Sequence, residues 1–330
     1  MGWALLAGGE PMMFNTARIL VGDNRKTLAT LEAGSVQTCI TSPPYWGLRD
    51  YGEDDQIGLE QTPDDYVEQL CLVFDAVWRV LADDGTLWLN LGDSYAGGSA
   101  ASGGTQRLGP NGTLNNQRND VQLKKVGQGL KPKDIIGIPW RVAFALQARG
   151  WFLRSEIIWN KPNPMPESVT DRPTKSHEHI FLLSKSAKYF YDHEAIKEDA
   201  LTEPAARNKN AEGYQADYAK GDRFSPGERV FGTDGKRNKR DVWTVPTQPF
   251  AGAHFAVYPP ALIEPCVLAG SREGDTILDP FSGSGTTGVV ALRNGRNYVG
   301  TELNPQYAEL SKKRISDDCG MFGEVEIEHI

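Results

Sequence analysis

The residues best suited to chemistry form a short run, Ser42-Pro43-Pro44-Tyr45, after an apolar stretch that ends at Ile40. The apolar stretch predicts a strand, and two consecutive prolines end it because neither has an N–H for a neighbouring strand. The run should form a stiff elbow at the carboxyl end of a strand, where open α/β sheets bind ligands. By itself, the run is equally compatible with a simple turn.

A second stretch, residues 279–288, has the features of an adenosine-binding site. Glycines let the backbone approach a ligand closely, and the helix predicted after them offers free N–H groups. Glu302 ends the next predicted strand, where an acid can hold both ribose hydroxyls. The candidate cofactor-binding residues in the stretch itself are Asp279, Phe281, Gly283, Gly285 and Thr286.

The glycines also fit the dinucleotide pattern GxGxxG, which makes a nicotinamide oxidoreductase a rival reading. Asp279 argues against it, because this residue places a negative charge where a pyrophosphate would lie. The same charge suits a cationic ligand that carries an amine and a sulfonium. In addition, few strands remain after the glycines to build a second nucleotide-binding half.

Composition limits the remaining possibilities. The chain has 330 residues and a net charge of -8, so any contact with nucleic acid must come from a local basic patch. The four scattered cysteines contain no CxxC pair and predict buried thiols in a reduced, cytoplasmic protein. No apolar run is long enough to span a membrane, and the first residues make a poor signal peptide.

Apolar periodicity predicts alternating strands and helices, and thus an α/β sheet. The expected strands cover 18–21, 36–40, 86–91, 152–159, 179–184, 276–278 and 297–300, and the expected helices cover 64–81, 139–149, 259–268 and 305–315. Two regions lack periodicity. One is a glycine-rich loop over about 95–133, predicted to be a mobile flap. The other is the polar stretch over 193–250.

Several single residues have two readings. Asp23 can cap a helix or face the cofactor. His177 and His179 form an HxH pattern with no further ligand cluster, so we predict no metal site. Cys266 follows a proline, as does the nucleophile of enzymes that methylate cytosine C5. Because it lies in an apolar helical run, we expect it to belong to the core.

The Ser-Pro-Pro-Tyr run early in the chain and Asp-Pro-Phe-x-Gly-x-Gly-Thr late in it resemble the S-adenosylmethionine-dependent DNA amino-methyltransferases. The order of the two motifs resembles their permuted β group. The resemblance implies a Rossmann-like, mostly parallel sheet with helices on both faces and an inserted target-recognition region. It also implies S-adenosyl-L-methionine as cofactor and adds His254, Phe255 and Ala256 to the residues that line its pocket.

This resemblance divides the chain into four parts. They are an N-terminal tail over 1–17, a catalytic half over 18–192, a target-recognition region over 193–250 and a cofactor-binding half over 251–330. The implied partner is double-stranded DNA. The implied location is the cytoplasm, and the implied origin of the protein is a prokaryote or a phage. A homodimer and a cognate restriction endonuclease stay open. Candidate DNA contacts are Arg49, Lys236, Arg237, Lys239 and Arg240.

The resemblance also assigns a mechanism to the elbow. An exocyclic amine of a base is a poor nucleophile, since its lone pair is delocalised into the ring. Acceptors aimed at its hydrogens, such as the Pro43 carbonyl and the Ser42 hydroxyl, favour a pyramidal nitrogen that can attack. Tyr45 would stack on the base, which must first be flipped out of the duplex.

The identity of the base depends on the first residue of the elbow. In this family, a serine tends to go with cytosine N4 and an aspartate with adenine N6. Ser42 therefore favours N4-cytosine methylation, with N6-adenine methylation as the alternative. An RNA methyltransferase and a catalytically silent DNA-binding module are more remote readings.

Overall fold

The computed structural model describes residues 15–48, 53, 55–96, 129–199, 235–248, 257–320 and 323–330. It also describes the backbone of four short strands, β1 (Ala4–Leu5), β2 (Pro11–Met12), β6 (Gln106–Leu108) and β7 (Leu114–Asn116). The first two pair with each other, as do the last two. Arg49 and residues 254–256, which carry four of the predicted contacts, lie outside the described residues.

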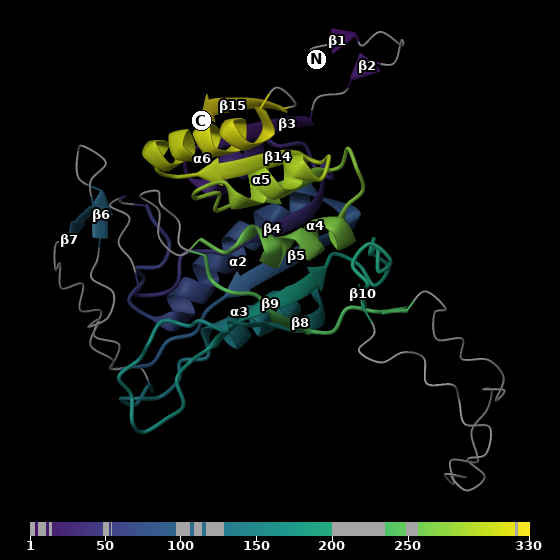
Figure 1. Cartoon of the computed structure of the whole chain (residues 1–330). Coiled ribbons are helices and arrows are strands. Elements are labelled where there is room, and N and C mark those ends of the chain that lie inside the picture. Colours follow the sequence, from purple (N-terminus) through teal and green to yellow (C-terminus); the bar gives the residue numbers. More distant parts are fainter. Residues whose placement is uncertain are drawn as a thin grey trace, which may run out of the picture.

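One large sheet organises the described chain (Figure 1). Its strand order is β12-β8-β9-β5-β4-β13-β14-β3-β15, and every neighbouring pair is parallel except the two pairs that β9 makes. This confirms the mostly parallel sheet. The strands are β3 (Asn15–Val21), β4 (Val36–Thr41), β5 (Leu81–Leu91), β8 (Phe152–Asn160), β9 (His177–Ser184), β12 (Val242–Thr244), β13 (Thr276–Asp279), β14 (Asn297–Glu302) and β15 (Gly323–His329).

Helices cover both faces of the sheet, as expected for a Rossmann-like fold. One apolar cluster joins α2 (Pro63–Val80) and α3 (Ile138–Ala148) to the strands. A second joins α4 (Pro260–Gly270), α5 (Thr286–Arg293) and α6 (Pro305–Cys319) to the opposite face. Side chains alternate between the clusters along a strand, since Phe181 faces the first cluster and Ile180 and Leu182 face the second.

Local sequence explains where the helices begin. Thr62 caps α2, because its hydroxyl accepts a hydrogen bond from the Asp65 N–H at 2.9 Å, and Pro63 occupies the first helical position. Asn304 and Pro305 repeat this arrangement at the start of α6. Asp23 caps the short helix α1 (Asn24–Thr27), which is followed by a 3₁₀ turn over 28–30.

The chain changes direction between the adjacent strands β4 and β13. From β4 it continues through α2 to β5 on one side, and from β13 it continues through α5 to β14 on the other. Because α2 and α5 lie on opposite faces, the two connections separate at the carboxyl ends of the strands. A crevice opens at such a switch point, and ligands bind there in open α/β sheets.

Three features differ from the sequence expectations. The three-residue strand β12 lies inside the range predicted for target recognition, yet it pairs with β8 in the core sheet and buries Trp243. Strand β15 was not predicted, and it pairs along its whole length with β3. Strand β5 begins at Leu81, directly after α2, although the sequence predicted a helix up to residue 81 and a strand only from residue 86.

Most of the predicted loop over 95–133 lies outside the described residues. Its two ends are joined, because the Ala96 N–H donates to the Asp134 carbonyl at 2.8 Å and the Lys133 N–H donates to the Ala96 carbonyl at 2.7 Å. The loop therefore leaves and re-enters the domain at one place.

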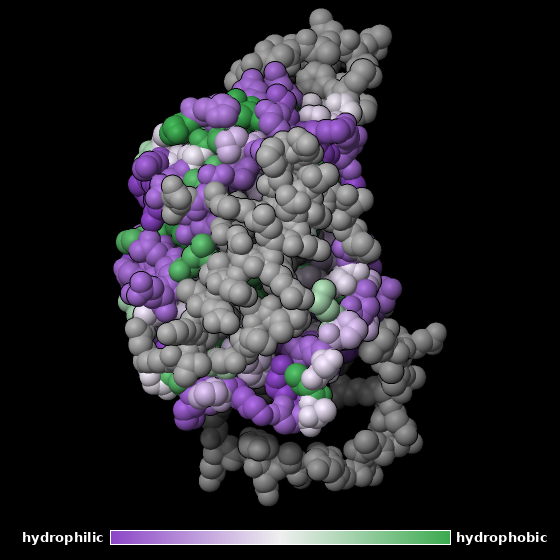
Figure 2. All heavy atoms as spheres, turned by 90° about the vertical axis from the view of Figure 1, so that its left-hand side faces the viewer, coloured by the Kyte–Doolittle hydropathy of each residue, from purple (hydrophilic) through white to green (hydrophobic). Residues whose placement is uncertain are grey.

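The described surface is mainly polar. On the face shown in Figure 2, hydrophilic residues predominate and hydrophobic ones are scattered among them. Within the described ranges, no helix is long and apolar enough to cross a bilayer. Three of the four cysteines are buried and Cys319 is half-buried, in line with the prediction of reduced thiols in the core.

Candidate active site

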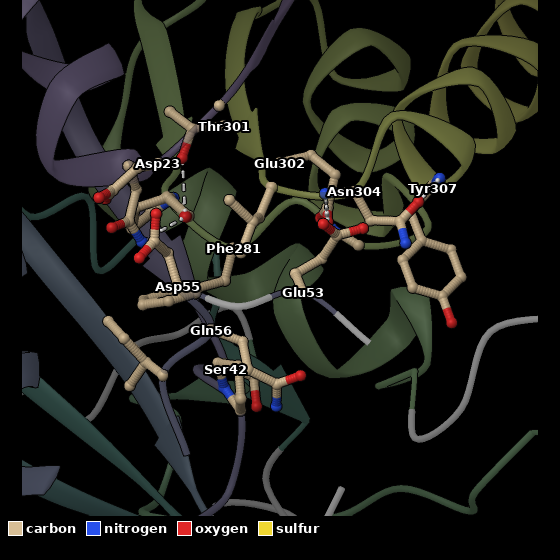
Figure 3. A pocket seen from close by; sticks show the side chains of 17 residues that line it. Asp23, Ser42, Glu53, Asp55, Gln56, Phe281, Thr301, Glu302, Asn304 and Tyr307 are labelled. Carbon is tan, nitrogen blue, oxygen red and sulfur yellow. Dashed lines mark hydrogen bonds between the residues drawn. The ribbon is translucent and has the colours of Figure 1, made fainter. Parts of the chain in front are cut away.

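A cavity of about 730 Å³, counted to its open mouth, lies at the crevice between the strand ends (Figure 3). Ser42 and Pro44 of the elbow line it on the β4 side. Phe281 and Gly283 of the glycine stretch, together with Glu302, line the same cavity. Two motifs far apart in the sequence therefore meet at one space.

Four carboxylates line this cavity. In the view of Figure 3, Asp23 and Asp55 lie on one side of Phe281, and Glu53 and Glu302 lie on the other. Apolar contact surface comes from Ile57, Leu303 and the ring of Tyr307, among others. An acidic and partly apolar lining suits a ligand that has both a flat ring and cationic groups. The sequence identified Asp23 and Glu302 but missed the two acids of the loop after the elbow.

Asp23 caps α1 and also lines the cavity. Its carboxylate accepts a hydrogen bond from the Arg25 N–H at 2.9 Å and also binds the Arg25 guanidinium. Burial raises the pKa of Asp23, but the hydrogen bonds and charge of Arg25 outweigh burial and leave that pKa below its usual value. The residue therefore caps α1 as an ionised group while it lines the cavity.

Glu302 is held by the loop that it faces. One carboxylate oxygen accepts the Gly283 N–H at 2.8 Å, and the other accepts the Asn304 N–H at 3.0 Å. Burial raises the pKa of Glu302 to about 7, despite these two hydrogen bonds. The carboxylate is thus positioned to accept further hydrogen bonds from a ligand, and it titrates close to neutral pH.

Asp279 lies beneath the cavity and does not line it. One of its oxygens accepts hydrogen bonds from the Thr41 hydroxyl at 2.6 Å and the Phe281 N–H at 3.0 Å. The other accepts from the hydroxyls of Thr287 at 2.6 Å and Tyr258 at 3.1 Å. Burial raises the pKa of this carboxyl in spite of the four donors. The sequence predicted that Asp279 contacts a cationic ligand directly. In the structure, its hydrogen bonds instead join the strand before the elbow to the glycine stretch.

The later residues of the glycine stretch pack against α6 instead of lining the cavity. Gly285 has a φ of +74°, and a Cβ there would lie 2.2 Å from the Ser311 hydroxyl oxygen. The Thr286 hydroxyl accepts a hydrogen bond from Arg314 at 2.7 Å. The sequence predicted both residues as cofactor contacts. The structure gives them a packing role, since a side chain at residue 285 would not fit.

Hydrogen bonds fix the elbow and the residue that follows it. The Tyr66 hydroxyl donates to the Pro44 carbonyl at 2.8 Å, and the indole N–H of Trp46 donates to the Glu60 carbonyl at 2.8 Å. The ring of Tyr45 lies against Gly92, where a Cβ would come within 2.5 Å of a ring carbon. The position of the ring therefore depends on a glycine at the end of β5.

A buried polar network, missed by the sequence interpretation, surrounds the Tyr45 hydroxyl. This hydroxyl donates to Glu178 at 2.6 Å, and the Asn90 amide nitrogen lies 3.1 Å from it and 3.0 Å from the Glu178 carboxylate. Lys161 binds the second carboxylate oxygen. One signal was available, because Asn90 is a polar residue in the apolar strand predicted at 86–91.

The predicted basic cluster lies at the far edge of the sheet, beside β12. Lys236 and Arg237 form the short strand β11, which pairs with β10 (Glu198–Asp199). Glu198 accepts hydrogen bonds from the guanidinium groups of Arg237 at 2.9 Å and Arg240 at 2.7 Å. Lys239 lies 5.1 Å from the centre of the Trp243 ring. Arg237 and Arg240 are thus bound to an acid of the same protein.

The HxH histidines have partners within the fold. His179 Nδ1 lies 2.6 Å from a Glu156 carboxylate oxygen, and the imidazole stacks on Phe181. In the part of the chain that the structure describes, no three His, Cys, Asp or Glu residues are grouped so as to hold a metal ion.

Sequence comparison decides the family. The profile described as DNA methylase matches residues 36–313, which is most of the chain. The chain belongs to the S-adenosylmethionine-dependent DNA amino-methyltransferases. This methyltransferase is 50% identical over 300 residues to the type II methyltransferase M.SmaI of Serratia marcescens, covering 91% of each chain. It is 47% identical over 309 residues to M.Cfr9I of Citrobacter freundii, covering 94% of this chain and 91% of the other.

Solved structures show the same fold. The PvuII DNA methyltransferase, described as cytosine-N4-specific, has a TM-score of 0.59 at 17% identity, with 95% of each chain covered. TTHA0409 of Thermus thermophilus, solved with S-adenosyl-L-methionine, has a TM-score of 0.58 at 23% identity and covers 94% of this chain and 99% of the other. The Rossmann-like methyltransferase fold is thus confirmed.

The cavity of this methyltransferase fits S-adenosylmethionine, which supplies an electrophilic methyl group on a sulfonium. An acceptor is available for ribose hydroxyls at Glu302, and Phe281 and Ile57 offer apolar contact to a flat ring. The carboxylates around the cavity complement a ligand with a positive amine and a positive sulfur. The fit comes from this chain's own residues.

Cys266 is not a catalytic nucleophile for C5 methylation. It is 1% exposed and lies in α4 within the apolar cluster under the sheet. Burial raises its pKa well above the usual value, so the thiolate that such chemistry needs does not form. The prediction of a core cysteine is confirmed.

Titration of Glu302 should make both stability and cofactor affinity depend on pH. Because its folded-state pKa of about 7 exceeds the usual 4.5, the folded protein binds the proton more tightly, and stability falls as pH rises between these values. Cofactor affinity should change in the opposite direction, since the ionised carboxylate is the better acceptor. We expect the Kd for S-adenosylmethionine to fall about tenfold from pH 6 to pH 8.

Isothermal titration calorimetry across this pH range measures the effect. Glu302→Gln should bind the cofactor more weakly and with no pH dependence, and above pH 7 it should be the more heat-stable protein before cofactor is added. A wild-type Kd that does not change between pH 6 and pH 8 would contradict the role of the carboxylate.

Proposed function

We propose that this enzyme transfers a methyl group from S-adenosylmethionine to the exocyclic N4 of a cytosine flipped out of double-stranded DNA at a specific sequence. The observation that supports this best is the shared cavity. Ser42 and Pro44 of the elbow line the same space as Gly283 and Glu302 of the cofactor motif. An amine held at the elbow would therefore face the transferable methyl group, which needs only in-line positioning.

The elbow supplies acceptors for the amine. In this proposal, the Ser42 hydroxyl and the Pro43 carbonyl accept its two hydrogen bonds and favour a nitrogen with an available lone pair. Pro44 keeps the elbow rigid, since its carbonyl is bound to Tyr66. Tyr45 stacks on the flipped base. The fixed backbone supports this reading, because acceptors that do not reorganise during the reaction stabilise developing charge most strongly.

Ser42 supports cytosine over adenine. A neutral hydroxyl at this position tends to go with N4-cytosine methylation in this family, whereas a carboxylate tends to go with N6-adenine methylation. The name of the PvuII enzyme agrees with this choice, although its low identity speaks only to the fold. N6-adenine methylation by the same mechanism is the second candidate.

Mass spectrometry of nucleosides tests the proposal directly. DNA of diverse sequence is incubated with the protein and S-adenosylmethionine, digested and analysed, with an Asp279→Ala protein as the inactive control. We expect N4-methylcytosine. N6-methyladenine would keep the fold and mechanism but overturn the argument from Ser42. If DNA gains neither base while an RNA panel does gain methyl groups, the proposed substrate is wrong.

We propose that the basic cluster beside β12 contacts DNA phosphates. Replacing Lys236 or Lys239 by glutamine removes one positive charge from the cluster and tests this proposal. Lys236→Gln and Lys239→Gln should each weaken binding to all sequences alike. Each should also reduce the slope of log K against log salt by about one unit.

Fluorescence anisotropy of labelled duplexes at several salt concentrations measures these slopes. Lys313→Gln is the matched control, because that lysine pairs with Asp317 on α6, away from β12. An unchanged slope in both cluster variants would place the DNA elsewhere. The type II relatives lead us to propose further that a cognate restriction endonuclease recognises the same site.

A further inference from the structure

Methyl transfer to an amine leaves one proton to be removed, and the active site contains a buried carboxylate in a suitable place. Glu178 lies in β9 and accepts a hydrogen bond from the hydroxyl of Tyr45, the last residue of the elbow. Its side chain is 14% exposed and that of Lys161, its partner, is 17% exposed. No step described above uses this carboxylate.

Hydrogen bonds link Glu178 to the elbow. The Tyr45 hydroxyl donates to Glu178 at 2.6 Å, and the rise that burial causes in the pKa of Tyr45 is partly offset by the nearby Ser42 hydroxyl. Asn90 draws the three groups together, since its amide nitrogen lies 3.3 Å from the Ser42 hydroxyl, 3.1 Å from the Tyr45 hydroxyl and 3.0 Å from Glu178. Ser42, Tyr45 and Glu178 thus form a continuous chain of groups that can carry a proton.

The orientation of the Asn90 amide follows from its contact with Glu178. The amide nitrogen must face Glu178, because an ionised carboxylate only accepts hydrogen bonds. The amide oxygen of Asn90 is buried, and among the described residues it has no hydrogen-bond partner. Burying an acceptor in this way is unfavourable. The fold keeps this unsatisfied oxygen, and in the same orientation the amide nitrogen contacts Ser42, Tyr45 and Glu178.

We propose that Glu178 is the final acceptor of the proton lost by the target amine, reached through the hydroxyls of Ser42 and Tyr45. This rests on the proposed function, in which Ser42 faces the amine. The amine lone pair forms the bond to the methyl carbon, and the carbon–sulfur bond breaks with its electron pair left on sulfur. An N–H proton passes to Ser42 while the serine proton passes to Tyr45 and the tyrosine proton passes to Glu178.

Charge balances in this scheme. A positive sulfonium and a negative carboxylate are converted into a neutral thioether and a neutral carboxylic acid, with Ser42 and Tyr45 restored. Lys161 keeps its own charge throughout. Because the Glu178 side chain is partly exposed, its proton can pass to water after the product leaves.

The surroundings keep Glu178 ionised before the reaction. Burial raises its pKa, but the charge of Lys161 and the hydrogen bonds from Lys161, Tyr45 and Asn90 outweigh burial and leave that pKa below its usual value. The other charged or titratable groups that face it are Lys175 and His177. A methylated aminium is a far stronger acid than a carboxylic acid, so even this weakly basic carboxylate accepts the proton readily.

Three variants separate proton transfer from simple positioning. Glu178→Gln keeps an acceptor for the Tyr45 hydroxyl but cannot take a proton. Lys161→Met keeps the carboxylate and removes its counter-charge. The double variant Lys161→Met/Glu178→Gln removes both charges and therefore leaves no unpaired ion. Glu68→Gln, at a surface pair with Arg149, is the matched control and should behave as wild type.

The measurement is the single-turnover rate of methyl transfer to DNA between pH 5 and pH 9, with cofactor affinity and melting temperature recorded for every variant. We expect Glu178→Gln to lose about 10²- to 10⁴-fold in rate with cofactor affinity unchanged. The double variant should recover its melting temperature and stay slow. Lys161→Met should shift the acidic limb of the pH profile upward by about one to three units, because the carboxyl loses its cation.

A carboxyl titration by NMR on the cofactor-free protein gives an independent readout of the Lys161→Met shift. Recovery of the rate in the double variant would show that Glu178 only neutralises Lys161, and the proposal would be wrong. A wild-type rate in Glu178→Gln would also overturn it. If wild-type protein itself transfers no methyl group to DNA, the proposed function fails instead, so the two failures are distinguishable.

Discussion

Asp279→Ala is expected to abolish methyl transfer and to lower the stability of the folded protein by about 3 kcal/mol or more. The substitution removes the shared acceptor of four donors in a place that is 2% exposed, although the hydroxyls of Thr287 and Tyr258 can still bond each other. Each buried polar group that loses its partner costs roughly 1–3 kcal/mol. Because Thr41 precedes the elbow and Phe281 lines the cavity, both motifs should lose their positions together. Chemical denaturation and a methylation assay measure the two effects.

Two further variants make this result interpretable. Asp279→Asn keeps the shape of the side chain but offers one accepting oxygen in place of two, so it should lose about half of the stability that alanine loses. Asp318→Ala is the surface control, since that carboxylate pairs with the exposed Arg293, and its cost should be about 0–1 kcal/mol. An Asp279→Ala protein that stays fully active would show that the two motifs are positioned independently.

Tyr45→Ala should reduce methyl transfer by at least about 10³-fold while cofactor affinity stays within about twofold of wild type. The expected loss combines base stacking, worth roughly 1–3 kcal/mol, with the loss of the hydroxyl between Ser42 and Glu178. Tyr45 does not line the cofactor cavity, which is why binding should survive. Single-turnover methylation and calorimetric titration with S-adenosylmethionine test the two halves of the prediction.

Two further substitutions separate the contribution of the Tyr45 hydroxyl from that of the position of its ring. Tyr45→Phe keeps the ring and removes the hydroxyl, so it should match Glu178→Gln in rate. Gly92→Ala keeps every functional group but forces the ring to move, because the new methyl group would lie 2.5 Å from it. We expect this variant to methylate slowly and to bind cofactor normally. Loss of cofactor binding in Tyr45→Ala, with methylation kept, would reverse the assigned roles.

Periodicity was sufficient to predict the long elements of this fold. Strands such as β4 and β14 and helices such as α2 alternate along the chain, and their apolar spacing reports which face is buried. Short strands do not carry such a signal. The three residues of β12 become a strand only because β8 offers a free edge. The seven residues of β15 do carry a signal that was missed, because Val325 and Ile327 alternate with glutamates.

Site residues were predictable where a sequence motif contains them. They were not predictable where strand pairing or helix packing brings them together. Glu302 and Phe281 follow from the order of strand, glycine loop and acid. Gly285 fits the same pattern, yet its requirement for glycine comes from α6, which packs against it. Asn90 and Glu178 meet only because β9 pairs antiparallel with β5, a register that no local pattern records. The recognition region over 193–250 stays a prediction apart from β12.

The pairing of β3 has a consequence for how the enzyme is made. This strand pairs with β14 and β15, and an ion pair joins Arg18 to Glu328 across 310 residues. During synthesis, β3 must therefore wait for its partners until residues 297–302 and 323–329 have left the ribosome. Contacts of such long range slow folding. Since Asp23 follows β3 and Glu302 ends β14, a nascent chain lacks its cofactor site until residue 302 has left the ribosome, and no methylation begins before then.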